Sequence, residues 1–401
     1  MSVQALDTPL EKTNYETISE EIKDLVERVI RPNADQIDRE GIFPRENLNV
    51  LIREGWGNIL VPQKYNGRGA DHTAHAIVVE EIAKACASTA LIFSMHVLAI
   101  QNIVEFGTED QIERWVKPIE KALLGTYSSS ERGSGGHFWY NLSQVTRDGN
   151  DYIYDAEKSF TTSAGHADFY LTQMRSPDAK DAKEICLLII DSKLPGIETS
   201  RWNTLGVRGN HSYTIHFNNV RIPRDELVGE EGKALPIVDQ TEAIYLLGLG
   251  STWTGVARHA YELAANHLIK ATHNHRGHNL ANYQILRHKL VETKLLLKSL
   301  KPWRLQLTEQ LNAFKKRNES PEELTLELME YKVHASEVAH QAASMAMDVS
   351  GGYGYVEGEI ERVFRDSRAG IAMGPSNNLA RDLISKAELG LPLELWEKDG
   401  D

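Results

Sequence analysis

Three histidines stand within six positions of each other in the run HNHRGH, at His273, His275 and His278. Three imidazoles at this spacing could reach one zinc or copper ion. No carboxylate stands among them, and a solvated turn accounts for the same residues. We therefore favour the turn over the metal site, and predict that the protein holds no metal there.

A glycine-rich turn follows a helical pattern near the C-terminus, with Gly351, Gly352 and Gly354 in the run SGGYG. Such a turn lets the backbone approach a ligand closely and offers its N–H groups. The same residues could simply end a helix. The turn becomes a candidate binding site only if other parts of the chain point to the same ligand.

The overall charge excludes several classes of function. The chain has 401 residues, with 44 Lys and Arg against 57 Asp and Glu, and a net charge of −13. This acidity argues against nucleic acid and anionic lipid as partners.

Cys86 and Cys186 lack the spacing of a zinc site or a disulfide framework. The N-terminus is polar and no long apolar run is present, so we expect no membrane span and a cytoplasmic location.

The elements that must position these residues change along the chain. Helical periodicity predicts helices over 14–40, 46–54, 73–106, 238–272, 281–314, 321–349, 357–368 and 376–389. Thr108, three residues before Gln111, predicts a helix N-cap. Short alternating runs from Gly125 to Val228 predict strands. The order indicates an α+β fold, mainly α, with domains at 1–125, 126–232 and 233–401.

Several motifs resemble one family. The run DVSGGYGYVEGEIERVFRD, from Asp348 to Asp366, resembles the C-terminal signature of the acyl-CoA dehydrogenase flavoproteins. SSERGSGGHF, from Ser129 to Phe138, resembles their first signature, and PQKYNGRGAD and EFGTEDQIERWVKPI resemble N-terminal segments. The resemblance covers nearly the whole chain. It implies an N-terminal α-helical domain, a central β-barrel, a C-terminal four-helix bundle, non-covalent FAD, and a homotetramer or homodimer.

The resemblance also implies which residues contact FAD. Ser130 and Thr162 match hydroxyls beside the flavin ring, and Phe160 matches an aromatic shield, although it could be an ordinary strand residue. His273 takes the place of a family Arg that reaches the FAD of a partner subunit, and Arg276 stands nearby. The full predicted set is Tyr127, Ser129, Ser130, Phe160, Thr162, His273, Arg276, Gln284, Asp348, Gly351, Gly352, Ser376 and Asn377.

The catalytic base departs from the family pattern. In the family a Glu removes the substrate α-proton while the flavin takes the β-hydrogen as hydride. The usual segment reads IAMGPSNNLAR here, with Met373 at that position, or Gly374 after a shift of one residue. Other members carry the Glu on the first helix of the C-terminal domain, where alignment offers Thr241 or Glu242. One residue is about 100° around a helix. We predict Glu242 as the base, with a solvated carboxylate as the alternative.

The first signature departs as well, because Gly136 and His137 stand where the family has Ser and Asp. With Met373, these two residues are expected to line the substrate site. This change suggests an altered substrate or reaction. His137 could exchange protons at neutral pH, or could be a surface turn residue.

Three functions follow from these features. The first is dehydrogenation of an acyl thioester, carried by CoA or an acyl-carrier protein, with an electron-transfer flavoprotein as a further partner. The second is a flavin monooxygenase or oxidase of the same fold. The third is a flavin-binding pseudoenzyme without activity.

Overall fold

The computed structural model describes residues 15–396, and the polar N-terminal segment discussed above lies outside this range. Six helices open the described chain: α1 (Tyr15–Leu25), α2 (Ala34–Glu40), α3 (Arg45–Arg53), α4 (His72–Ala83), α5 (Ala87–Phe106) and α6 (Glu109–Trp115). The predicted N-cap is confirmed, because Thr108 and Gln111 form a reciprocal capping box at the start of α6. Pro32 stands between α1 and α2, in a short 3₁₀ turn.

Helix α5 is the most apolar helix of this N-terminal part. It is the one described helix long and apolar enough to cross a membrane, and 89% of the relevant window is buried inside the protein. The Sγ of Cys86 accepts a hydrogen bond from the Thr89 amide and caps its first turn. Its side chains form part of the core shared with the C-terminal helices. This helix therefore serves as an internal support.

The middle of the chain forms two sheets of four strands each. The strands are β1 (Gly125–Ser128), β2 (Thr146–Asp148), β3 (Asp151–Thr161), β4 (Phe169–Arg175), β5 (Ile185–Asp191), β6 (Ile197–Ser200), β7 (Tyr213–Pro223) and β8 (Leu227–Val228). Their orders are β1-β4-β5-β8 and β2-β3-β7-β6. Tyr154 and Phe217 from one sheet pack with Tyr170 from the other. The predicted barrel is observed as two sheets that pack around one core. Among the described strands, no ladder of hydrogen bonds joins the two sheets into a closed barrel.

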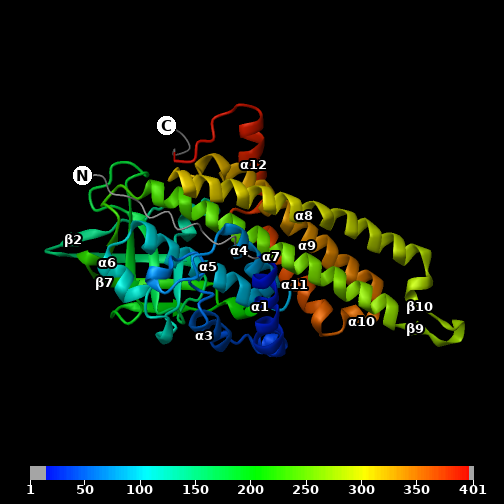
Figure 1. The fold of residues 1–401 in the computed structure, drawn as a ribbon. Helices are drawn as coiled ribbons and strands as arrows, with labels where there is room; N and C mark the ends of the chain where they lie inside the picture. The colour runs from blue at the N-terminus through cyan, green and yellow to red at the C-terminus, as the bar shows by residue number, and fades with distance from the viewer. Residues whose placement is uncertain (1–14, 397–401) are drawn as a thin grey trace, which may run out of the picture.

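Long helices make up the rest of the molecule: α7 (Leu235–Lys270), α8 (Gln284–Arg317), α9 (Thr325–Ser350), α10 (Gly352–Tyr355), α11 (Glu359–Ala372) and α12 (Asn377–Glu388). Helix α9 packs on α7, α8 and α11. The hairpin of β9 (Thr272–His273) and β10 (His278–Asn279) joins α7 to α8 at the end far from the sheets (Figure 1). The start of α7 therefore lies beside the sheets, while its C-terminal end lies near the hairpin.

Candidate active site

A cavity of about 320 Å³ lies where the sheets, the start of α7 and the segment after α11 meet. Nine of the predicted site residues line it: Tyr127, Ser129, Ser130, Gly136, Phe160, Thr162, Glu242, Met373 and Ser376. They come from four separate parts of the chain, so the fold brings together what the sequence leaves far apart.

Helix α7 presents one face to the cavity. Val238, Thr241, Glu242 and Tyr245 all line it, and their spacing of three, four and seven residues is that of one helix face. The hydroxyl of Thr241 is already engaged, because it donates to the carbonyl of Ile237 at 2.6 Å and accepts from Asn102 at 2.8 Å. Between the two candidates from the alignment, Glu242 is therefore the one with a side chain available to a ligand.

The environment of Glu242 favours its protonated form. Burial raises the pKa of its carboxyl to about 8, and the negative charge of Asp239, one turn earlier on α7, adds to the shift. Among the described residues that line the cavity, Glu242 is the one acid, and none is Lys, Arg or His. A carboxylate formed here has a high affinity for protons, as a base that attacks a weakly acidic C–H bond requires.

A turn after α11 forms the wall that faces α7. The hydroxyl of Tyr245 donates to the carbonyl of Gly374 at 2.8 Å. The ammonium of Lys332, on α9 and without exposed surface, donates to the carbonyls of Met373 and Pro375 at 3.0 and 2.7 Å. The carbonyls of three successive residues are thus held, the middle one from α7 and the other two from α9. Sequence reasoning missed Lys332; its position within the apolar pattern of α9 was the available signal.

Phe160 provides a test of whether a flat aromatic cofactor fits this site. It is 68% exposed, lines the cavity, and has a left-handed backbone with φ of 53° at a bulge in β3. The Oγ of Ser212 holds its carbonyl at 2.8 Å, and the ring of Trp202 lies 4.7 Å from its own. A large apolar ring kept exposed by a strained backbone is typical of a ligand-binding wall.

Polar groups on the strand side of the cavity give the same indication, and two unsatisfied atoms lie near them in residues outside the lining. The Oγ of Ser163 and the Oδ1 of Asn210 are buried without a hydrogen-bond partner among the described residues. On the same wall, the hydroxyl of Tyr127 donates to Gln173 at 2.6 Å, and Ser129, Ser130 and Thr162 add polar groups. An exposed ring beside several hydroxyls suits a flavin, which has an apolar face and a polar edge. The residues present therefore fit this cofactor.

Other predicted site residues lie away from the cavity. His273 and Arg276 are exposed on the hairpin, where the Nδ1 of His273 is 2.7 Å from the hydroxyl of Tyr283. Asp348 pairs with Lys289 at 2.8 Å at the far end of the bundle. Gln284, Gly351 and Gly352 are also exposed at that end. Their predicted contact with the FAD of a partner subunit stays a prediction.

Two further residues take structural positions. His137 does not line the cavity, and its ring stands edge-on to Trp139 at 5.4 Å. Asn377 is buried, and its Oδ1 accepts from Lys332 at 3.0 Å. In the single chain, Asn377 therefore supports the turn and does not face the cavity.

Comparison with known proteins identifies related chains. Three family models match: acyl-CoA dehydrogenase N-terminal domain at residues 12–121, middle domain at 126–220, and C-terminal domain at 247–389. Human mitochondrial short-chain specific acyl-CoA dehydrogenase is 29% identical over 360 residues, which are 88% of this chain and 85% of that protein. The 3-(aryl)acrylate reductase of Clostridium sporogenes is 26% identical over 88% of this chain and 93% of its own.

Solved structures show the same fold. Butyryl-CoA dehydrogenase from Megasphaera elsdenii superposes with a TM-score of 0.86 at 24% identity, covering 95% of this chain and 100% of its own. The prolyl acyl carrier protein oxidase AnaB superposes with a TM-score of 0.83 at 21% identity, with the same coverage. At these identities the likeness concerns the fold alone.

Proposed function

The chain belongs to the acyl-CoA dehydrogenase family, and from this premise we propose that it is an FAD-dependent oxidoreductase that dehydrogenates an acyl thioester. The observation that carries the proposal is the position of Glu242. Its carboxyl lines the cavity on the face of α7 that looks onto the hydroxyl-rich strand wall. A base and a cofactor wall on the two sides of one cavity suit the removal of two hydrogens from neighbouring carbons.

The cofactor would be held by the strand side of the cavity. Phe160 offers a ring face, and Tyr127, Ser129, Ser130 and Thr162 offer polar groups. When bound, FAD supplies the acceptor for the β-hydrogen, which leaves the substrate as hydride. His273 and Arg276 remain candidates for the phosphates of the FAD in a partner subunit.

Glu242 performs the proton step. Its ionised carboxylate takes the α-proton, the electron pair of the broken C–H bond becomes the α,β double bond, and the β C–H bond gives up hydride. Apolar side chains, among them Met95, Leu98 and Phe138, line the same cavity and keep water from the ionised base. Lys332 and Tyr245 hold the turn after α11, which forms another wall of the cavity. The site therefore needs one base, one hydride acceptor and a dry cavity.

Replacement of Glu242 tests this assignment directly. We expect E242Q to keep its FAD spectrum and to lose substrate-dependent bleaching without oxygen by about 100- to 10,000-fold. Glu262 lies on the same helix and outside the cavity, so E262Q is the matched control and should bleach normally. Unchanged bleaching in E242Q would contradict the role of Glu242 as the base. A purified protein without flavin absorbance would contradict the proposal that FAD is the cofactor.

For the substrate, we propose a thioester carried by an acyl-carrier protein in preference to CoA. No Lys, Arg or His is among the described residues that line the cavity, so the lining offers no cation to the several phosphate charges of CoA, whereas the pantetheine arm of a carrier protein bears a single phosphate. Anaerobic titration with one acyl group on CoA, on a carrier and on a short pantetheine separates these substrates. Faster reduction by the CoA ester than by the carrier-bound ester would contradict the preference.

We further propose a homotetramer or homodimer in the cytoplasm, served by an electron-transfer flavoprotein. Three large apolar side chains on α8, Ile285, Val291 and Leu295, are between 55% and 64% exposed in the single chain, which suits burial against a second copy. Light scattering on the purified protein measures the oligomeric state. The domain boundaries 1–125, 126–232 and 233–401 remain part of the same proposal.

A further inference from the structure

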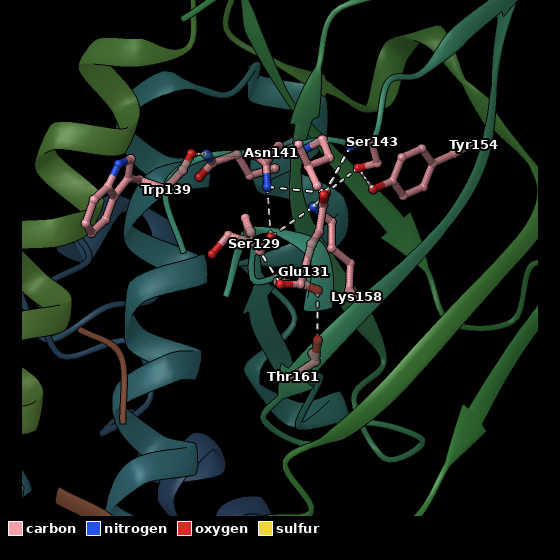
Figure 2. Close-up of polar contacts among 12 residues, drawn as sticks. Ser129, Glu131, Trp139, Asn141, Ser143, Tyr154, Lys158 and Thr161 are labelled. Carbon is pink, nitrogen blue, oxygen red and sulfur yellow. Dashed lines mark hydrogen bonds and ion pairs between the residues drawn. The ribbon is translucent and has the colours of Figure 1, made fainter. Parts of the chain in front are cut away.

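A buried ion pair lies directly behind the hydroxyl wall of the cavity. Glu131, in the loop after β1, is 5% exposed, and Lys158, on β3, has no exposed surface. Their Oε1 and Nζ atoms are 2.7 Å apart (Figure 2). A buried ion pair often stabilises a fold less than an apolar pair of the same volume, because both charges lose their hydration. Its presence therefore calls for a structural or functional explanation. The mechanism above does not use either residue.

The carboxylate of Glu131 joins the two ends of one loop. It accepts hydrogen bonds from the amide of Leu142 at 2.7 Å and the amide of Ser143 at 3.1 Å. The hydroxyl of Ser143 donates to it as well, and the side-chain Nδ2 of Asn141 does so at 3.4 Å. Burial raises the pKa of Glu131, but the ammonium of Lys158 and these donors bring it below its ordinary value. Burial lowers the pKa of the Lys158 ammonium, and the Glu131 carboxylate 2.7 Å away opposes that shift.

Lys158 and Asn141 hold one backbone carbonyl of the wall, and the strand β3 backbone holds the next. The carbonyl of Ser129 accepts from Nζ of Lys158 at 3.0 Å and from Nδ2 of Asn141 at 2.8 Å (Figure 2). The carbonyl of Ser130 accepts from the amide of Ser159 at 2.8 Å. Both carbonyls are thus engaged within the protein, while Ser129 and Ser130 line the cavity. Among the described residues no acceptor is bonded to the N–H groups of Ser130 and Glu131.

From this arrangement we propose that Glu131 and Lys158 are positioning residues that fix the backbone at Ser129, and with it the N–H donors of Ser130 and Glu131 beside the cofactor, and so set how readily the bound flavin accepts electrons. Donors fixed toward the flavin edge stabilise the charge that arrives on reduction. The inference rests on the proposed function, because it requires the flavin to lie against this wall. It assigns the pair a role through geometry, since the net charge of the ionised pair is zero.

Two single variants separate geometry from charge. E131Q leaves an unpaired cation behind the wall, and K158M leaves an unpaired anion. If the pair acts through positioning, both variants lose the fixed donors, and the reduction potential of the bound flavin shifts to more negative values in both. If the pair acts through its charge, the two shifts have opposite signs, which would overturn the proposal. Unchanged potentials in both variants would overturn it as well.

FAD affinity gives a second readout that does not depend on turnover. We expect both variants to raise the FAD dissociation constant by about tenfold, because several hydrogen bonds that order the wall are lost. N141A, which removes one donor to the Ser129 carbonyl and keeps the ion pair, should give a smaller shift in the same direction. If the two charge variants do not fold, N141A takes their place as the test. An unchanged potential and an unchanged FAD affinity in N141A would then contradict the proposal.

Glu226 provides the matched control. It is a buried carboxylate of the same strand-rich segment, it accepts from the indole of Trp115 at 3.0 Å, and it does not line the cavity. E226Q therefore carries the same chemical change and should leave the potential unaltered. If the wild-type protein binds no FAD, the proposed function is wrong. If E131Q and K158M bind FAD with normal reduction potentials, only this inference is wrong.

Discussion

The hydroxyl of Tyr245 lies 2.8 Å from the carbonyl oxygen of Gly374, and this hydrogen bond joins the helix of the proposed base to the turn on the opposite wall. Tyr245 stands three residues after Glu242 on the same face of α7. The separation between the base and that turn is therefore set by a direct contact between α7 and the segment after α11. In the proposed mechanism this contact helps to fix where the Glu242 carboxyl lies in the cavity.

The first prediction concerns the pH dependence of substrate oxidation. Since burial raises the pKa of Glu242 to about 8, the base is mostly protonated at pH 7, and the rate of anaerobic flavin reduction by substrate should rise through pH 8 and level off above it. D239N removes the nearby negative charge, so the pKa of Glu242 should fall and the profile should move to lower pH. Stopped-flow reduction at a series of pH values measures both curves. A D239N profile that moves upward would contradict the assignment.

The second prediction concerns stability. The folded state holds the proton of Glu242 up to about pH 8, while the unfolded state releases it near 4.5, so the folded state binds more protons between these values. Stability contributed by this group is therefore lost as pH rises through that window. We expect the wild type to lose up to about 4 kcal/mol of stability relative to E242Q between pH 5 and pH 9. Urea unfolding of both proteins at the two pH values checks it, with E262Q as the parallel control.

The third prediction concerns the turn held by Lys332. K332M keeps much of the side-chain volume and removes the donors to Met373, Pro375 and Asn377. Three buried acceptors then lack a partner, and we expect a loss of at least about 2 kcal/mol in the free energy of unfolding. The variant should also raise the substrate KM, because the wall is no longer fixed. K298M, an exposed change on α8, should alter neither quantity; equal effects of the two variants would contradict the role of Lys332.

The fourth prediction concerns a variant that carries the base in the turn after α11 instead of on helix α7. A Cβ atom added at Gly374 would approach the Phe138 ring no closer than 3.5 Å, which is ordinary contact. A longer side chain can therefore enter the cavity from this position. We expect the double variant E242Q/G374E to recover at least about tenfold of the bleaching rate that E242Q loses. E242Q/G374Q has the same shape without the base and should recover nothing, so equal rates in the two double variants would disprove the prediction.

The order of secondary structure could be predicted because each element leaves a local pattern. The helical periods of the last third and the capping box at Thr108 depend on neighbours in sequence, and both are confirmed. The pairing of β1 with β4 and of β3 with β7 joins strands distant in sequence, so alternation alone could not show that the sheets stay unclosed. Lys332 was missed for a similar reason, since its three acceptors lie more than forty positions away.

The motifs and their order in the sequence were enough to indicate the family, the proposed FAD wall and the shortlist of Glu242 and Thr241 for the base, because they are local properties. The fold supplied the reason to prefer Glu242 in the proposed mechanism. Neighbours on a helix differ by about 100° in direction, and the choice rests on what each side chain meets: Thr241 is bound to Asn102 of α5, whereas Glu242 opens into the cavity. The buried pair of Glu131 and Lys158 is likewise visible only once β3 lies beside the loop after β1.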